Sequence, residues 1–254
     1  MKYPYPCPPN SPGFTLAEVA IVLLIVGLLM GGLLPTLSGQ IDERHNTDTT
    51  KQLNDIRDAL IGFALTYGRL PCPAAPNTTG VESPVGGGAC TNFYNGFVPA
   101  ATLGLSGSDS AGYAVDSWGN RIRYAVTSWN SASPALNDVF TTSNGMSAVG
   151  ISNLVPTSLA VCSSSTGISG SSCGSAYWLT SSTMGVPAVI YSTGKNGAQG
   201  SAGPDEAANL DANQTFVIHL PTGSGTTGGY FDDIVIWISP NVLINRMVAA
   251  GKLP

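Results

Sequence analysis

The longest apolar run of the sequence lies near its N-terminus, from Phe14 to Leu34. Its 21 residues include one charged side chain, that of Glu18. A helix rises about 1.5 Å per residue, so this run would be roughly 31 Å long, close to the thickness of the hydrocarbon core of a bilayer. The pattern therefore predicts a membrane helix that carries one unusually placed carboxylate.

The residues that follow predict that this helix continues beyond the apolar layer. Residues 40–51 are strongly polar. After them, apolar residues recur every three or four positions, beginning with Leu53, Ile56 and Leu60, which is typical of an amphipathic helix. Pro71 favours an end to the helix shortly before it. We expect the amphipathic part to pack on a sheet.

The rest of the chain contains short apolar segments of the kind that form strands. They cover residues 123–126, 187–192, 216–220 and 232–238. Ser239 followed by Pro240 favours the start of a short C-terminal helix. Together these segments predict an α+β fold, in which the second part of the long helix packs on an antiparallel sheet of roughly four to six strands.

The composition is that of a loop-rich domain outside the cytoplasm. Charged residues make up 10% of the chain, against about a quarter in ordinary soluble domains, whereas Gly (31) and Pro (18) are abundant. The net charge of −5 provides no basic surface of the kind that binds nucleic acid. A cytosolic helical enzyme and a nucleic-acid-binding protein are both disfavoured.

Four cysteines follow the apolar run, and a fifth, Cys7, precedes it. The four are Cys72, Cys90, Cys162 and Cys173, and none has CxxC spacing. An even number of cysteines is typical of disulfides in an oxidising compartment, and four allow three connectivities. We expect Cys72 to pair with Cys90 and Cys162 with Cys173, since each bridge would close a loop rich in Gly and Ser. Four buried free thiols are the alternative.

The N-terminal segment fits three kinds of targeting sequence unequally. A cleaved secretory signal would have a shorter apolar core, more basic residues than Lys2 alone and a cleavage site of small residues. A plain membrane anchor fits the length but leaves Glu18 unexplained. The stretch from Gly13 to Glu18, GFTLAE, resembles the cleavage site of type IV pilins and of type II secretion pseudopilins.

This resemblance implies roles for four residues. A prepilin peptidase would cut after Gly13 and methylate the new N-terminal Phe14. Glu18 matches the glutamate that the family has as the fifth residue of the mature chain, and Pro35 matches a proline that the family often carries. In a stack of subunits, a neighbour's N-terminal amine can pair with the Glu18 carboxylate, which is otherwise costly to bury.

The resemblance also implies an organisation and a location. The expected parts are a leader (1–13), a transmembrane and assembly helix (14–35), its amphipathic continuation (36–70) and an extracytoplasmic pilin-like domain (71–254). The expected location is the inner membrane, crossed once with the N-terminus in the cytoplasm and the domain in the periplasm, and then an extracytoplasmic filament. The expected partners are prepilin peptidase, other pilin or pseudopilin subunits, the inner-membrane assembly platform and membrane lipid, with no nucleic acid.

A second resemblance concerns the C-terminal half of the chain. Residues 116–120, Asp-Ser-Trp-Gly-Asn, resemble the Asp-Pro-Trp-Gly-Asn stretch of major pseudopilins, where Asp116 would cap a tight turn and Trp118 would cover the sheet edge. The order of a strand, a Gly-rich loop, an acidic loop and a last strand resembles the calcium-binding end of the same proteins. Calcium prefers about six to eight oxygen ligands. The side chains that this resemblance offers are those of Asp205, Asp211, Asp232 and Asp233, with Asn196 or Asn209. Simple solvated acidic turns are the alternative.

The leading hypothesis is a structural subunit of a type IV pilus or a type II secretion pseudopilus, without catalytic activity. One alternative is a minor or tip pilin that acts as an adhesive binding module. A membrane-anchored periplasmic enzyme is less favoured, because the two histidines suggest no catalytic site and no nucleophile elbow, zinc motif or paired catalytic carboxylates can be named. We expect His45 on a solvated helix face and His219 in the core or at a sheet edge.

Overall fold

The computed structural model describes residues 13–130 and 137–253, with the backbone alone at residues 30–38. Most of the predicted leader, including Cys7, and the side chain of Pro35 therefore lie outside the described residues. The chain divides into two compact units, Met1–Arg44 and His45–Pro254.

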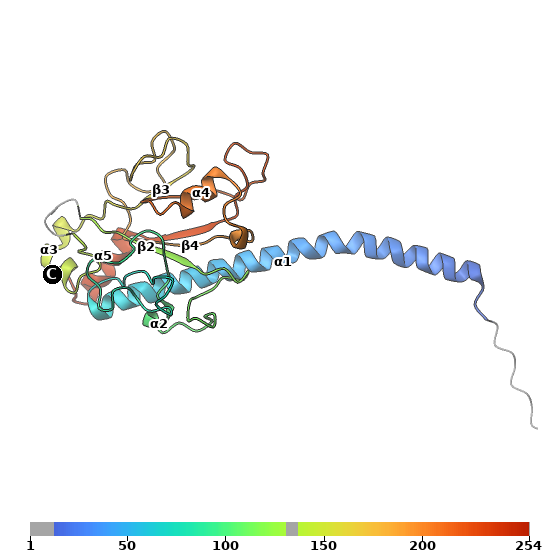
Figure 1. The fold of residues 1–254 in the computed structure, drawn as a ribbon, viewed down its shortest axis with the longest axis horizontal. Helices are drawn as coiled ribbons and strands as arrows, with labels where there is room; N and C mark the ends of the chain where they lie inside the picture. Colours follow the sequence, from blue (N-terminus) through green and yellow to red (C-terminus); the bar gives the residue numbers. More distant parts are fainter. Residues whose placement is uncertain (1–12, 131–136, 254) are drawn as a thin grey trace, which may run out of the picture. The chain divides into compact units, whose positions relative to one another are not determined.

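The order of helices and strands matches an α+β fold (Figure 1). The elements are α1 (Leu16–Tyr67), β1 (Gly96–Phe97), α2 (Ala100–Leu103), β2 (Arg123–Val126), α3 (Gly145–Val149), the 3-10 helix η1 (Ile151–Asn153), β3 (Ala160–Cys162), β4 (Ala188–Ser192), the 3-10 helix η2 (Gly197–Gln199), α4 (Pro204–Leu210), β5 (Thr215–Val217), β6 (Ile234–Ile238) and α5 (Pro240–Ala249). The strands predicted at 123–126, 187–192 and 232–238 correspond to β2, β4 and β6.

The two parts of α1 have different surroundings. In the first unit its described apolar side chains are exposed, as at Leu16 (88% exposed) and Leu28 (71%). In the second unit Leu53, Ile56 and Leu60 are buried in the main core. The predicted change from an apolar helix to an amphipathic helix that packs on a sheet is therefore confirmed.

The main sheet has four antiparallel strands in the order β1-β2-β4-β6. Tyr124 of β2 lies opposite Ile190 of β4, which in turn lies opposite Ile236 of β6. Because side chains alternate between the faces of a strand, these three residues share the face that packs on α1 and α5. The buried side chains of Leu243 and Met247 place α5 on this same core.

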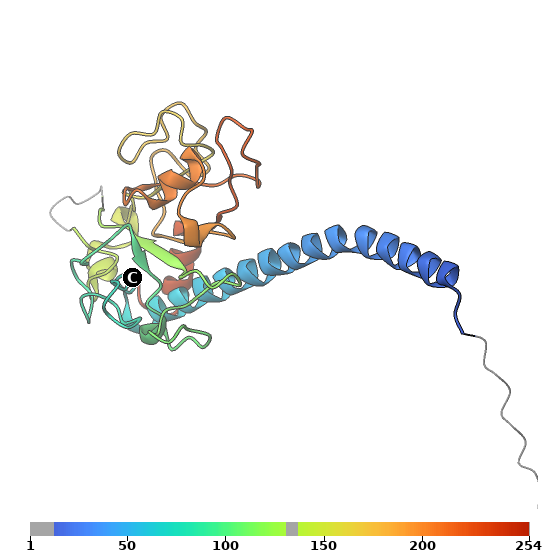
Figure 2. The ribbon, with the colours of Figure 1, turned by 45° about the vertical axis from the view of Figure 1, so that its right-hand side comes forward.

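A second layer covers the other face of the sheet (Figures 1 and 2). Val189 and Tyr191 of β4 point into a core with Val161 of β3 and Phe216 of β5. β3 and β5 pair in parallel and form a separate two-stranded sheet. The strand predicted at 216–220 is therefore shorter than expected and lies outside the antiparallel sheet.

Both predicted disulfides are present, and each closes a loop as expected. Cys72 is bonded to Cys90 and Cys162 to Cys173. The first loop also holds a buried ion pair between Arg69 and Glu82, whose side chains are joined by two hydrogen bonds of 2.7 and 2.8 Å. The Glu82 carboxylate also accepts hydrogen bonds from the backbone N–H groups of Cys72 and Gly86.

The buried ion pair predicts a large stability effect. Replacing Glu82 with Gln removes the charge opposite Arg69, and breaking such a pair from one side costs roughly 3–5 kcal/mol. We expect a marked decrease in the free energy of unfolding, measured by urea denaturation of the detergent-extracted chain. Asp58→Asn is the control, because it alters the exposed Arg57–Asp58 pair and should change stability by less than about 0.5 kcal/mol. Equal effects of the two variants would contradict the prediction.

Candidate functional site

The first residues of α1 form a capping box. One oxygen of the Glu18 carboxylate accepts hydrogen bonds from the backbone N–H of Thr15 (2.8 Å) and from its hydroxyl (2.9 Å). In return, the N–H of Glu18 donates to the Thr15 hydroxyl at 3.3 Å. This reciprocal pattern satisfies N–H groups that a helix start otherwise leaves without partners. The T-x-x-E spacing is visible in the sequence, but the resemblance to pilins implied only an intersubunit partner for Glu18.

The helix that follows presents an apolar surface. Val22, Leu23 and Leu24 are between 57% and 66% exposed, and Leu28 is 71% exposed. Exposed apolar side chains in such continuous succession are characteristic of surfaces that contact a membrane or another protein. Gly13 and Phe14, the residues on either side of the predicted cleavage, are also exposed.

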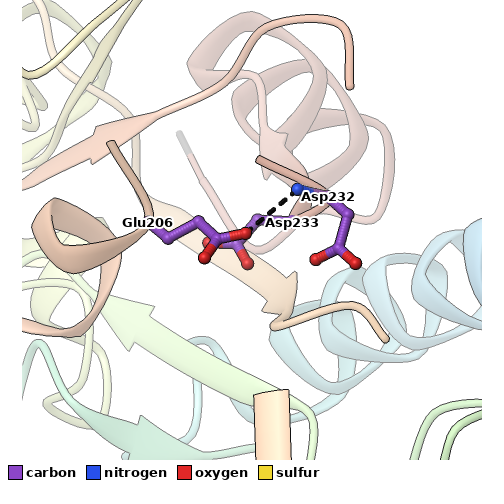
Figure 3. Close-up of side chains that lie close together, drawn as sticks. All are labelled: Glu206, Asp232 and Asp233. Atoms are coloured by element: carbon purple, nitrogen blue, oxygen red, sulfur yellow. Dashed lines mark hydrogen bonds between the residues drawn. The ribbon is translucent and has the colours of Figure 1, made fainter. Parts of the chain in front are cut away.

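A second candidate site is an acidic cluster at the beginning of β6. It consists of Glu206 from α4 and of Asp232 and Asp233, which directly precede β6 (Figure 3). One carboxylate oxygen from each residue lies within 4.8 Å of the others. Glu206 (1% exposed) and Asp233 (7%) are buried. Carboxylate oxygens are hard donors of the kind that Ca²⁺ and Mg²⁺ prefer.

Hydrogen bonds hold the three carboxylates in place without neutralising them. Glu206 accepts from the side-chain amide of Asn196 (2.8 Å) and from the N–H of Asp232 (3.1 Å). Asp233 accepts from the side-chain amide of Asn209 at 2.8 Å. One oxygen of Asp232 accepts from the N–H of Lys195, whereas its other oxygen, Oδ1, is buried without a hydrogen-bond partner among the described residues. That oxygen is an unused ligand atom.

The electrostatics of the cluster favour a proton or a cation. The pKa of Asp233 is raised to about 8, chiefly by burial and also by the negative charges of Glu206 and Asp232, although the hydrogen bond from Asn209 lowers it. Burial, with a contribution from Glu206, also raises the pKa of Asp232. A bound divalent cation would favour the charged carboxylates that burial disfavours. The donor set therefore fits a hard cation, whose remaining ligands would be water or backbone oxygens.

The structure brings only two of the four predicted metal ligands into this cluster. Asp205 is buried elsewhere, where its carboxylate accepts from the N–H of Ser165 (2.7 Å) and lies 3.1 Å from Nε2 of His219. Asp211 is exposed and bonds to Asn213. The acidic loop of the sequence analysis is in fact the helix α4, in which Pro204 at the first turn was an overlooked start signal.

The turn at residues 116–120 supports the loop beside the cluster. One oxygen of Asp116 accepts from the N–H groups of Trp118 (2.9 Å) and Asn120 (2.8 Å), so the predicted cap is present. Its other oxygen accepts from the hydroxyl of Ser192 at 2.6 Å. The side chain of Asn120 donates to the carbonyl of Gly194 at 2.7 Å, just before the residues that bond to the carboxylates.

The two histidines differ in how well they were predicted. His45 is half-buried and edge-on to Trp118, with 5.6 Å between the ring centroids, so its predicted place on a solvated face was wrong. Contact with the turn at 116–120 excludes water from one side of its ring. His219 stacks on Phe231 at the margin of the domain core, as expected for a histidine at an edge.

Comparison with known proteins gives one match, which lies in the N-terminal segment. The prokaryotic N-terminal methylation motif matches residues 9–34, and this motif is the prepilin signal of type IV pilins and pseudopilins. The motif implies processing by a prepilin peptidase and assembly with other pilins, as a structural subunit. No curated protein and no solved structure matches the chain.

None of the described helices combines the length and the apolar character needed to cross a membrane.

Proposed function

We propose that this chain is a filament-forming subunit of a type IV pilus or a type II secretion pseudopilus, without catalytic activity of its own. The observation that carries the proposal is the methylation motif at residues 9–34, placed at the start of a helix with an exposed apolar surface. Cleavage between Gly13 and Phe14 leaves a mature chain that begins two residues before α1. The disulfide-bonded domain is then displayed outside the cytoplasm.

The location and partners follow from the same proposal. The subunit is held in the inner membrane by one span that includes residues 14–35, with its domain in the periplasm, until the assembly platform moves it into the filament. Membrane lipid and later the helices of other subunits cover the exposed apolar side chains. Glu18 supplies the charge that pairs with the N-terminal amine of a neighbour, and Pro35 lies where the apolar run ends.

Cleavage and methylation can be read directly from the mass of the protein. We expect the chain extracted from membranes of a host with an active prepilin peptidase to begin at Phe14 and to carry one methyl group on its amine. Mass spectrometry of the N-terminal peptide measures both. Replacing Gly13 with Val, which places a bulky side chain at the cleavage site, should leave the chain intact as the control. An uncut wild-type chain in that host would refute the proposal.

Two substitutions separate the charge of Glu18 from its role in the capping box. Gln can form the same capping box as Glu but has no charge, whereas Ala provides neither. We expect subunits with Glu18→Gln or Glu18→Ala to be processed and held in the membrane. Both should enter filaments poorly, because both lack the charge that forms the ion pair. Immunoblots of the sheared-filament fraction measure incorporation. Normal incorporation of Glu18→Gln would show that Glu18 acts as a cap alone.

The acidic cluster is proposed to bind Ca²⁺ through Glu206, Asp232 and Asp233. Their oxygens lie close together, they are hard donors, and Oδ1 of Asp232 lacks another partner among the residues described. This assignment keeps two predicted ligands and replaces Asp205 and Asp211 with Glu206. The cation would offset the repulsion among the three carboxylates and join α4 to the start of β6.

Calcium binding at this cluster predicts a shift in thermal stability. A Ca²⁺ concentration about a hundred times the Kd should raise the unfolding midpoint of the detergent-extracted chain by about 5–10 °C over its value in EDTA. Circular dichroism measures the midpoint. Asp233→Asn should abolish the shift, and Asp211→Asn, outside the cluster, should retain it. Identical midpoints with Ca²⁺ and with EDTA would rule out the site.

A minor or tip pilin with an adhesive surface is a second candidate, favoured by the block at 137–185. Cys162, Cys173 and Ala160 form a small core of their own in this block. Tyr177, beside this core, is 83% exposed. A separately stabilised block with an exposed aromatic side chain is suited to contact with an external surface.

A further inference from the structure

A groove of about 460 Å³ is lined by residues of α1, the end of β6 and α5. Its apolar lining includes Ile61 and Leu65 of α1 and Trp237 of β6. Two arginines and one carboxylate also line it, Arg57 and Asp58 from α1 and Arg246 from α5. A partly apolar lining with a net positive charge suits a partner that is partly apolar and negatively charged.

A glycine on the wall of this groove indicates that something approaches the helix closely. Gly62 lies inside α1, where glycine is a poor helix former compared with alanine. A Cβ atom at this position would meet nothing within 4 Å, so packing within the chain does not require glycine here. The missing side chain leaves the backbone of α1 open to the backbone of a partner. This surface suits a partner that is itself narrow and regular, such as a helix.

The two arginine side chains of the groove make few interactions within the described part of the chain. The guanidinium of Arg246 makes no hydrogen bond or ion pair with any described residue. Arg57 contacts Asp58 at 3.4 Å, but both side chains are substantially exposed, and such a pair contributes little. Arg246 therefore remains available for an external carboxylate, and Arg57 can exchange its weak contact with Asp58 for one.

The same chain carries matching carboxylates in an earlier stretch of α1. Asp48 and Asp55 are exposed residues of α1, seven positions apart and hence on the same side of the helix. Neither makes an ion pair with any residue in the described part of the chain. Their spacing of about two turns, roughly 10.5 Å, allows both to engage a single extended groove.

We propose that the groove receives α1 of a second copy of this chain, so that Asp48 and Asp55 of one subunit meet Arg246 and Arg57 of the next. Gly62 lets the two helices approach closely. The inference rests on the proposed filament function and identifies one contact of the assembly. Because the groove (residues 57–65 of α1) and the two carboxylates (Asp48 and Asp55) occupy different stretches along the helix, their contact is heterologous. Repetition of a heterologous contact that does not close on itself produces a helical filament.

Charge reversal and its rescue test the contact in the full chain, expressed with its assembly machinery. Arg246→Glu should reduce the sheared-filament fraction by about tenfold, because it places carboxylates opposite each other. Adding Asp48→Lys or Asp55→Lys to that variant should restore at least half of the loss. Lys252→Glu is the matched control, since it makes the same charge change at an exposed residue outside both the groove and the acidic stretch of α1. Normal assembly of Arg246→Glu, or failure of both rescues, would overturn the proposal.

Cross-linking in membranes distinguishes this contact from the filament function itself. Two differently tagged chains, one with Gly62→Cys and one with Asp55→Cys, are co-expressed in a Cys7→Ser background. A short bis-maleimide should give a product that carries both tags, and replacing Asp55→Cys with Ser224→Cys in an exposed loop should not. A doubly tagged product without filaments would support the contact and count against the filament proposal. Filaments without that product would overturn the contact alone.

Discussion

The structure depends first on the burial of the apolar surface of the long helix α1. An apolar helix surface is stable only where something removes it from water, since each buried leucine-sized side chain contributes about 1.5–3 kcal/mol. In the second part of α1 the domain provides this cover, and Leu53, Ile56 and Leu60 are buried against the sheet. A slip of one residue in the strand pairing would turn Tyr124 and Ile190 away from α1, so the helix also fixes the register of the sheet.

The remaining constraint is that polar groups within this compact domain need partners. Glu82 and Asp116 show how this is achieved: each buried carboxylate bonds to backbone N–H groups and to a further side chain, Arg69 or Ser192. The cluster around Asp232 departs from this pattern, since three carboxylates crowd together and one oxygen has no partner among the described atoms. Departures of this kind occur most often where a site has a function, which is why this end of the sheet merits attention as a ligand site.

The sequence predicted the elements that have strong local signals. The long apolar run, the three-to-four spacing after Leu53 and the start at Pro240 led to α1 and α5, and short apolar segments led to β4 and β6. The pairing of β3 with β5 could not be predicted in this way. Each of these strands has three residues, too few for a periodic pattern, and they lie far apart in the sequence.

The candidate site was only partly predictable for a similar reason. Asp232 and Asp233 were identified through the resemblance of this end of the chain to the calcium-binding end of major pseudopilins. The sequence did not distinguish Asp205 from Glu206, because neighbouring residues point about 100° apart on a helix but have no defined directions in a loop. Once these residues form the first turn of α4, Glu206 joins the cluster and Asp205 turns to His219. The choice of ligand thus depended on whether a seven-residue segment is helical.

The geometry at Glu18 suggests how the proposed cleavage and assembly are linked through charge. In the capping box, hydrogen bonds from Thr15 satisfy the carboxylate but leave its negative charge in place. Before cleavage, the bond between Gly13 and Phe14 is a neutral amide, so the leader provides no positive charge at this point. Cleavage converts that amide nitrogen into an amine, and each processed subunit then carries both a carboxylate and a cation at the start of α1. In a stack, the Glu18 carboxylate of one processed subunit can therefore pair with the N-terminal amine of the next. An uncut chain would instead place an unpaired carboxylate among apolar helices, where its burial is costly.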